Sequence, residues 1–210
     1  MKKIVLIVTF IILLSGCTNI KNASYDDIIN IIAMPTKKAN VYRTGNKFHL
    51  PREMKITKSK LCNEVLSDKN NIYYLYIDLI SYHNKIKNHK EINKESYYSK
   101  NIKSNNKEGY VDIKLLKNGK YFIEIMYNYA KIEVIVDEKD IKEVLLNSIN
   151  ILNSIKYTDD VIANLLNKDN LNYIEEEYNI FNTTSSDSTI QIDYNYHEME
   201  DEIVDTDLIN

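Results

Sequence analysis

The 210-residue chain has little cysteine, glycine or proline and no tryptophan: it contains two Cys, four Gly and two Pro. So few glycines exclude a collagen-like chain, and two cysteines exclude a disulfide framework. A protein with several membrane spans is also excluded, because only the first fifteen residues contain a long apolar run. What remains is one ordinary globular domain with additional terminal segments, since a domain usually takes about 100 to 200 residues.

The amino terminus has the pattern of a secretory signal. Lys2 and Lys3 give a positive start, and an apolar stretch from Ile4 to Leu14 follows. This stretch is too short to span a bilayer comfortably, which takes roughly 20 residues. A charged start, a short apolar core and small residues before a cleavage site predict a signal peptide over residues 1–16.

The residues at the predicted cleavage site are Leu14-Ser15-Gly16-Cys17. They resemble the lipobox of bacterial lipoproteins, in which small residues precede an obligatory cysteine. The resemblance implies that Cys17 carries a diacylglyceryl group and that cleavage falls between Gly16 and Cys17. It also implies a protein anchored by lipid to the extracytoplasmic face of the cell membrane, for which two acyl chains suffice. The alternative is an ordinary secretory signal in which Cys17 occurs by chance.

Cys62 is the only other cysteine of the chain. If Cys17 is lipidated, no intramolecular disulfide can form, and Cys62 is a lone thiol in an exported protein. We expect it to pack as a small apolar side chain, and the alternative is a reactive thiol.

Charge is distributed unevenly along the chain. Residues 157–210 carry fourteen acidic side chains and one basic side chain, whereas residues 17–156 carry 24 basic and 16 acidic ones, a net charge of +8. Such a split predicts electrostatic partners rather than a fold. The lysines of the body are scattered singly and arginines are not clustered, which disfavours nucleic acid as a partner. Anionic lipid headgroups or cell-wall polymers suit an exported, anchored chain better.

The body reads as strands followed by a helix. Residues 17–46 are predicted to form a lipidated spacer, which contains a short helix capped by Ser24 and a connection over 37–46. Strands are predicted to follow over 47–51, 54–57 and 61–66. The run 72–82 favours a central strand. The lysine-rich residues 83–107 predict a long excursion that contains at most a short helix or strand near Tyr97 and Tyr98. A hairpin over 110–127 is predicted to turn at Asn118-Gly119 in a type I′ turn, followed by a strand over 129–136.

A closing helix and a polar tail complete the predicted organisation. Asp137 is expected to cap an amphipathic helix that runs to Lys156, and residues 157–181 are expected to form a helical extension. Residues 182–210 have too little apolar surface to compensate for ordering, so an acidic disordered tail is predicted. The predicted fold class is α+β: a globular domain over residues 47–156, with a mainly antiparallel sheet and a C-terminal packing helix.

Few residues are candidates for chemistry. The glycines are too dispersed for a phosphate-binding loop. His83 and His89 lack further ligands at metal spacing, and His49 and His197 are isolated. No cofactor or metal is therefore predicted.

Asp78 is a charged residue on an otherwise apolar face of its predicted strand, because Tyr76 and Ile80 share that face. A buried carboxylate must be paired or hydrogen-bonded, which makes Asp78 a candidate catalytic residue of an envelope hydrolase. The structural alternative is a strand-end acid bonded to a Tyr, a Lys or a backbone amide. A glycosidase needs two such carboxylates, and nothing nominates a second one, since alternation places Glu124 on a solvent-exposed side.

The segment Phe48-His49-Leu50-Pro51 and the helix end Asn153-Ser154-Ile155-Lys156 resemble the opening strand and closing helix of PsbP/Mog1-like domains. This resemblance covers residues 47–156. It implies an αβα sandwich that serves as a non-enzymatic binding or assembly module, without catalytic residues. The expected function is therefore a binding or accessory module of the cell envelope. The envelope hydrolase and a purely structural surface protein are the alternatives.

Overall fold

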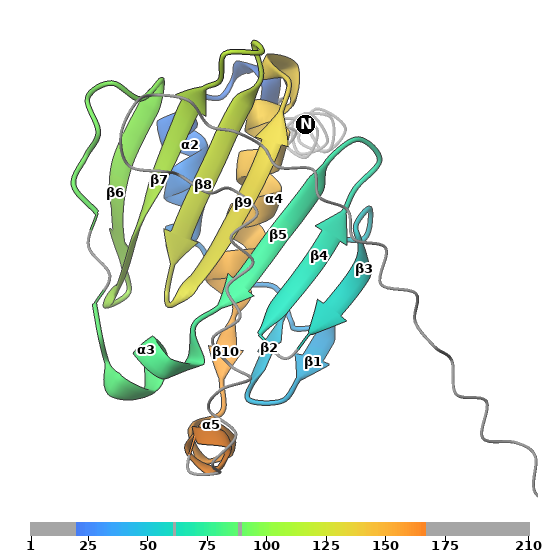
Figure 1. Ribbon diagram of the computed structural model, residues 1–210, viewed down its shortest axis with the longest axis vertical. Helices are drawn as coiled ribbons and strands as arrows, with labels where there is room; N and C mark the ends of the chain where they lie inside the picture. Colours follow the sequence, from blue (N-terminus) through green and yellow to red (C-terminus); the bar gives the residue numbers. More distant parts are fainter. Residues whose placement is uncertain (1–19, 61, 88–89, 167–210) are drawn as a thin grey trace, which may run out of the picture. The chain divides into compact units, whose positions relative to one another are not determined.

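The computed structural model describes residues 20–60, 62–87 and 90–166 (Figure 1). The predicted signal peptide, Cys17, His89, His197 and the predicted acidic tail lie outside the described residues. The described part of the chain confirms an α+β fold with a mainly antiparallel sheet and a C-terminal packing helix.

A seven-stranded antiparallel sheet forms the centre of the body, in the order β3-β4-β5-β9-β8-β7-β6. Two meanders make up this sheet, β3 to β5 and β6 to β9, and the pairing of β5 with β9 joins them. The strands are β3 (Lys55–Lys60), β4 (Asn63–Ser67), β5 (Ile72–Ile77), β6 (Tyr98–Ser104), β7 (Lys107–Leu115), β8 (Tyr121–Tyr127) and β9 (Ala130–Val136).

Alternation of side chains gives the large sheet one apolar face, which packs on helix α4 (Ile141–Ser154). The strands bury every second residue on this face, for example Tyr73, Leu75 and Ile77 in β5. The buried residues of α4 recur every three or four positions, as a helix lying on a sheet requires. The hydrophobic core therefore lies between α4 and the sheet (Figure 1).

The amino-terminal segment packs on the same side as α4. Helix α2 (Tyr25–Asn30) begins at Ser24, whose hydroxyl accepts from the Asp27 amide while the Asp27 side chain accepts from the Ser24 amide. This capping box confirms the predicted cap. Two short 3₁₀ helices flank α2, η1 (Ile20–Asn22) and η2 (Ile31–Ala33). The Lys142 Nζ in the first turn of α4 donates to the Lys21 carbonyl at 2.6 Å, so η1 lies at the start of α4.

A second, three-stranded sheet lies beyond the other end of α4. It has the order β1-β2-β10, with β1 (Val41–Arg43), β2 (Asn46–Phe48) and β10 (Lys156–Tyr157). The Arg43 Nε lies 2.5 Å from Oε1 of Glu64, a buried residue of β4, so an ion pair joins the two sheets. Helix α5 (Asp159–Leu166) follows β10 within the predicted helical extension, and its buried Ile162 packs next to Gly45.

The turn chemistry differs from the prediction. Gly119 has a left-handed φ of +79°, but Asn118 does not, and the Gly119 amide donates to the Leu116 carbonyl at 3.0 Å. The predicted hairpin is therefore confirmed, but its connection is a three-residue loop, residues 117–119, that ends in a left-handed glycine, and not a two-residue type I′ turn. Both central residues have positive φ at Asn105-Asn106 and at Asn128-Tyr129, the two-residue turns of β6–β7 and β8–β9.

Three predicted segments need correction. The strand predicted over 72–82 ends at Ile77, because Asp78 caps helix α3 (Leu79–Asn84) instead of continuing the strand. The excursion predicted over 83–107 contains β6, an edge strand with a single buried apolar residue, Ile102, and thus no visible alternation. The connection predicted over 37–46 contains β1, whose three residues are too few to show a period.

The helix predicted from Asp137 begins with a 3₁₀ turn, η3 (Glu138–Asp140), and the Asp137 side chain makes no capping hydrogen bond. Both α2 and α4 lie on one face of the large sheet (Figure 1). Residues 20–60, 62–87 and 90–166 thus form two layers, and the third layer of an αβα sandwich is not formed by them.

Candidate functional site

Asp78, the candidate catalytic residue, lies at the junction of β5 and α3. Its Oδ1 accepts a hydrogen bond from the Ser81 amide at 2.7 Å, and its backbone amide donates to the Tyr129 carbonyl at 2.8 Å. This is the N-cap geometry that satisfies an otherwise unpaired amide of the first helical turn. The structure thus places Asp78 as a strand-end acid bonded to a backbone amide, the structural alternative in the sequence analysis.

Cys62 is buried, with 4% of its surface exposed, and packs in the core. Burial, helped by the negative charge of Asp78, raises the pKa of the Cys62 thiol to about 11. A thiol that stays protonated at neutral pH is a poor nucleophile. The structure therefore confirms the expectation that Cys62 packs as a small apolar side chain.

The described histidines lie apart from each other. His49 lies in the segment after β2, with Nδ1 3.0 Å from the Lys38 carbonyl, and His83 is exposed in the last turn of α3. Within residues 20–60, 62–87 and 90–166, no group of three His, Cys, Asp or Glu side chains is placed to hold a metal ion.

A row of carboxylates that the sequence analysis missed lies on the face of the large sheet opposite α4. Asp112, Glu124 and Glu133 are directly opposite one another on β7, β8 and β9. We refer to these three residues as the acid row. Directly opposite side chains of an antiparallel pair have their Cβ atoms about 5 Å apart, so like charges there repel unless they are compensated.

Lysines compensate the acid row. The Nζ of Lys90 lies 3.1 Å from Oδ2 of Asp112 and 2.6 Å from Oε1 of Glu124, and it stands 4.7 Å from the centre of the Tyr110 ring. Further along, the Nζ of Lys131 lies 2.9 Å from Oε1 of Glu133. The expectation that Glu124 faces solvent is wrong, because only 15% of its side chain is exposed.

Lysine contacts hold Asp112 and Glu124 of the acid row ionised. Burial by itself raises the pKa of Asp112, but contacts with Ser96 and Lys90 and the charge of Lys114 outweigh it, and the net shift is downward. The pKa of Glu124 is also lowered, since the hydrogen bond and charge of Lys90 outweigh its burial. A glycosidase needs one carboxyl group whose pKa is raised, so that it can donate a proton. Neither Asp112 nor Glu124 is such a group, and both serve instead to fix Lys90, and with it the segment before β6, against the sheet.

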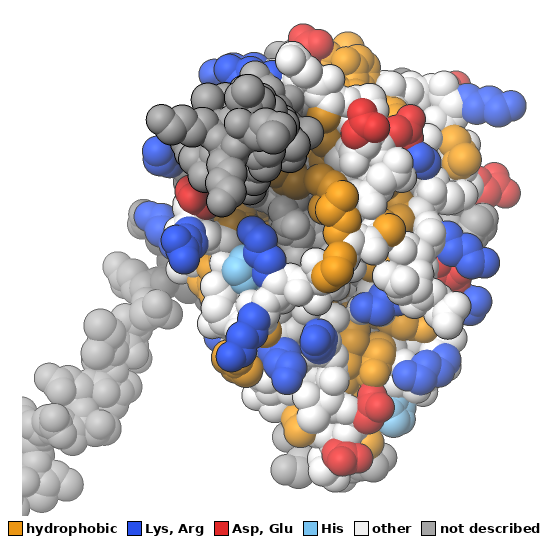
Figure 2. Space-filling view, turned by 180° about the vertical axis from the view of Figure 1, so that it is seen from behind, with side chains coloured by type: hydrophobic (Ala, Val, Ile, Leu, Met, Phe, Trp, Pro, Cys, Tyr) orange, Lys and Arg blue, Asp and Glu red, His pale blue; other side chains and the backbone are white. Residues whose placement is uncertain are grey.

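Lysines that pair with no acid among the described residues lie at the other end of α4. Lys156 of β10 is directly opposite Lys47 of β2, and both side chains are exposed. Tyr42 of β1 is opposite Lys47 in turn and shares this outer face, with 62% of its surface exposed. Figure 2 shows Lys and Arg side chains gathered over the lower half of the face seen there.

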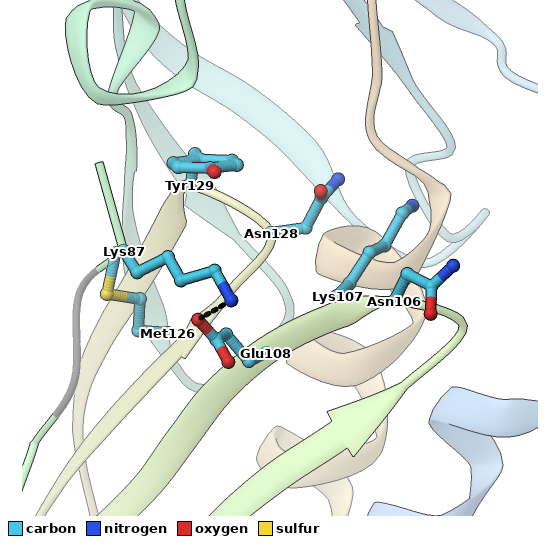
Figure 3. Close-up of a pocket in the computed structure, with 7 residues that line it drawn as sticks. All are labelled: Lys87, Asn106, Lys107, Glu108, Met126, Asn128 and Tyr129. Atoms are coloured by element: carbon cyan, nitrogen blue, oxygen red, sulfur yellow. Dashed lines mark ion pairs between the residues drawn. The ribbon is translucent and has the colours of Figure 1, made fainter. Parts of the chain in front are cut away.

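Lys107 belongs to the same end of the molecule. It begins β7 and lines a small pocket with Lys87, Asn106, Glu108, Met126, Asn128 and Tyr129 (Figure 3). Lys87 and Glu108 form an ion pair of 3.5 Å, and the ammonium group of Lys107 points away from them. Burial and then the positive charge of Lys156 lower the pKa of Lys107, so the two lysines lie within electrostatic range. The pocket holds about 60 Å³, room for a small ion or a few waters.

We refer to Lys47, Lys107 and Lys156 as the basic end. None of the three makes an ion pair with an acid in the described part of the chain. The lysines that contact the acid row, by contrast, each make such an ion pair. The nearest acids in the sequence are Asp159 and Asp160 of α5, and Asp159 accepts a hydrogen bond from the Tyr82 hydroxyl at 2.6 Å. The basic end can therefore attract an anion from solution.

Comparison with known proteins gives no relative: no family model matches the chain, and neither a curated protein nor a solved structure is significantly similar to it. No helix among the described residues is long and apolar enough to cross a membrane.

Proposed function

We propose that the chain is a lipid-anchored module on the extracytoplasmic face of a bacterial cell membrane, and that its body binds an anionic component of the envelope without turning it over. The anchor rests on Leu14-Ser15-Gly16-Cys17 after a short apolar run. The ligand class rests on the net charge of +8 over residues 17–156.

One observation supports binding over catalysis most directly. Each carboxylate of the acid row lies within 4 Å of a lysine, whereas the lysines of the basic end have no acid within that distance among the described residues. Charges that are compensated internally stabilise the fold, and charges that are left uncompensated remain free to attract a partner. The positive charge of the body is thus presented to the surroundings.

The first test concerns the anchor. The wild-type chain and Cys17→Ala are expressed in a bacterium and compared by intact mass and by partitioning into detergent. We expect only wild type to enter the detergent phase, with a mass that corresponds to cleavage before Cys17 plus lipid. A wild-type chain that stays uncleaved and in the aqueous phase would refute the anchor and the proposed location.

The hydrolase alternative is tested at Asp78. Asn is as good an N-cap as Asp, so Asp78→Asn keeps the start of α3 while it removes the carboxylate. We expect binding of envelope material to be unchanged in this variant. Any hydrolysis of envelope polymers that wild type shows and Asp78→Asn lacks would favour the hydrolase.

A further inference from the structure

Ile20, the first described residue, and the basic end lie at opposite ends of α4. Helix η1 begins at Ile20 and packs at the start of α4, where Lys142 donates to the Lys21 carbonyl. Lys156 comes directly after the end of α4, and β2 brings Lys47 next to it. A helix of 14 residues is about 21 Å long at 1.5 Å per residue.

The tether of the anchor is shorter than this distance. Two residues, Thr18 and Asn19, lie between Cys17 and Ile20, and the three Cα–Cα steps from Cys17 to Ile20 span at most about 11 Å when fully extended. A lipid on Cys17 therefore holds the start of α4 close to the membrane, while the basic end stands about two helix turns or more beyond the reach of the tether. At physiological ionic strength the field of anionic headgroups is screened over about 8 Å. With α4 upright on the membrane, the basic end therefore faces away from the anchoring membrane and towards whatever lies outside it.

The chemistry of the basic end is compatible with phosphate groups as ligands. All three side chains are lysines, whose compact ammonium groups bind phosphate as point charges. The Lys47–Lys156 pair presents two adjacent ammonium groups on one outer face, and Lys107 adds a third that is half-buried beside the pocket. Charges that repeat along a polymer can engage all three lysines at once, which a single small anion cannot.

We propose that Lys47, Lys107 and Lys156 form a binding site for a phosphodiester-linked polymer of the cell wall, directed away from the membrane that holds Cys17. The direction of the site rests on the lipid anchor of the proposed function, whereas the site itself does not. Exposed Tyr42 extends the outer face beside Lys47 and offers a ring against which sugar units of such a polymer can stack.

The test uses full-length lipidated chain in phosphatidylcholine vesicles and measures capture of fluorescent inorganic polyphosphate by co-sedimentation at 0.15 M salt. The site variant carries Lys47→Gln, Lys107→Gln and Lys156→Gln. The control variant carries Lys55→Gln, Lys120→Gln and Lys139→Gln, which removes the same charge from three exposed lysines at the end of the sheet near the start of α4.

We expect the site variant to bind polyphosphate about 100-fold more weakly, at roughly fivefold per lysine, and the control to stay within about threefold of wild type. Affinity should fall with salt, with a log–log slope near −2 in wild type and near zero in the site variant. Equal losses in both variants, or no capture by wild type, would overturn the site.

Two further arms separate the possible ligands. With 30% phosphatidylglycerol in the vesicles, polyphosphate capture should stay unchanged. Strong competition by this lipid would place the basic end on the membrane and overturn its direction. Polygalacturonate, a carboxylate polymer, should bind at least tenfold more weakly than polyphosphate, and equal binding would overturn the preference for phosphate. If Cys17 proves not to be lipidated, the proposed location fails, yet the comparison of site and control variants still decides the site in solution.

Discussion

The acid row and the basic end contain similar numbers of charged side chains but differ in how those charges are compensated. In the acid row, three carboxylates on neighbouring strands are matched by lysines at 2.6 to 3.1 Å. In the basic end, Lys47 and Lys156 are directly opposite each other, and no acid among the described residues pairs with either. Repulsion between like charges is compensated in the acid row and is not compensated in the basic end. We therefore assign a role in stability to the acid row and a role in binding to the basic end.

The largest effect is expected at the buried carboxylate that pairs with an arginine. Glu64 has 3% of its side chain exposed, and the Arg43 guanidinium is its partner across the two sheets. Arg43→Met leaves this carboxylate buried without a partner and should lower the free energy of unfolding by about 3 to 5 kcal/mol. Urea unfolding measures the loss.

Two controls define this prediction. Arg52→Met removes an exposed arginine and should change the stability by less than about 0.5 kcal/mol. The double variant Arg43→Met with Glu64→Leu should recover most of the loss, since an apolar pair can replace a buried ion pair. Equal stability of Arg43→Met and Arg52→Met would show that the ion pair between the sheets contributes nothing.

The second prediction concerns the lysine that holds the acid row. Lys90→Met removes the contact that Asp112 and Glu124 share and should destabilise the protein by about 2 to 3 kcal/mol. The loss is smaller than at Arg43 because Lys114 remains, 3.6 Å from Asp112. Lys87→Met is the matched control, because its ion pair with Glu108 is exposed and such pairs contribute about 0 to 1 kcal/mol. Similar losses in the two variants would contradict a structural role for the acid row.

Local patterns predicted much of the fold. The hairpin over 110–127, the strand after it and α4 were all predicted, because alternation and helical spacing lie within a few consecutive residues. Strand β6 was predicted only as a short helix or strand near Tyr97 and Tyr98, because its single buried apolar residue, Ile102, shows no period. The strand into Asp78 was extended too far, since a side-chain cap can end a strand whose composition still favours β structure.

The charged regions could be predicted only in part. Alternation places Asp112 and Glu124 each on one face of its strand, but their position opposite Glu133 depends on the register of three strands. Lys90 reaches them from a segment without a pattern. Lys47 and Lys156 come from opposite ends of the body and meet through the small sheet, which the sequence analysis did not predict. Net charge alone predicted that the body is basic, but the location of its uncompensated charge required the structure.

The third prediction is the pH dependence that the acid row imposes. The pKa of Asp112 and that of Glu124 are lowered in the folded state. Near these pKa values the folded state therefore binds fewer protons than the unfolded state. Their stabilisation is complete above the ordinary values of 3.8 and 4.5 and is lost as the pH falls through the lower folded values. Urea unfolding between pH 7 and pH 3 should therefore show a steeper loss in wild type than in Asp112→Asn with Glu124→Gln. Parallel curves would indicate that these two acids do not titrate differently on folding.

The smallest effect is expected at the basic end, and its sign is opposite. Two like charges directly opposite on neighbouring strands destabilise a sheet by a few tenths of a kcal/mol, so Lys47→Gln and Lys156→Gln should each stabilise the protein by about 0.3 kcal/mol. Either substitution removes the same repulsion, and the double variant should therefore gain little more than a single one. This non-additivity in a double-mutant cycle, measured by thermal unfolding at low salt, isolates the pair from general charge effects.

The gain in stability should disappear at 1 M salt, where repulsion between exposed charges is screened over about 3 Å. Additive gains that persist at high salt would mean that the two lysines do not repel each other, and the basic end would then lose the uncompensated charge on which its role in binding depends.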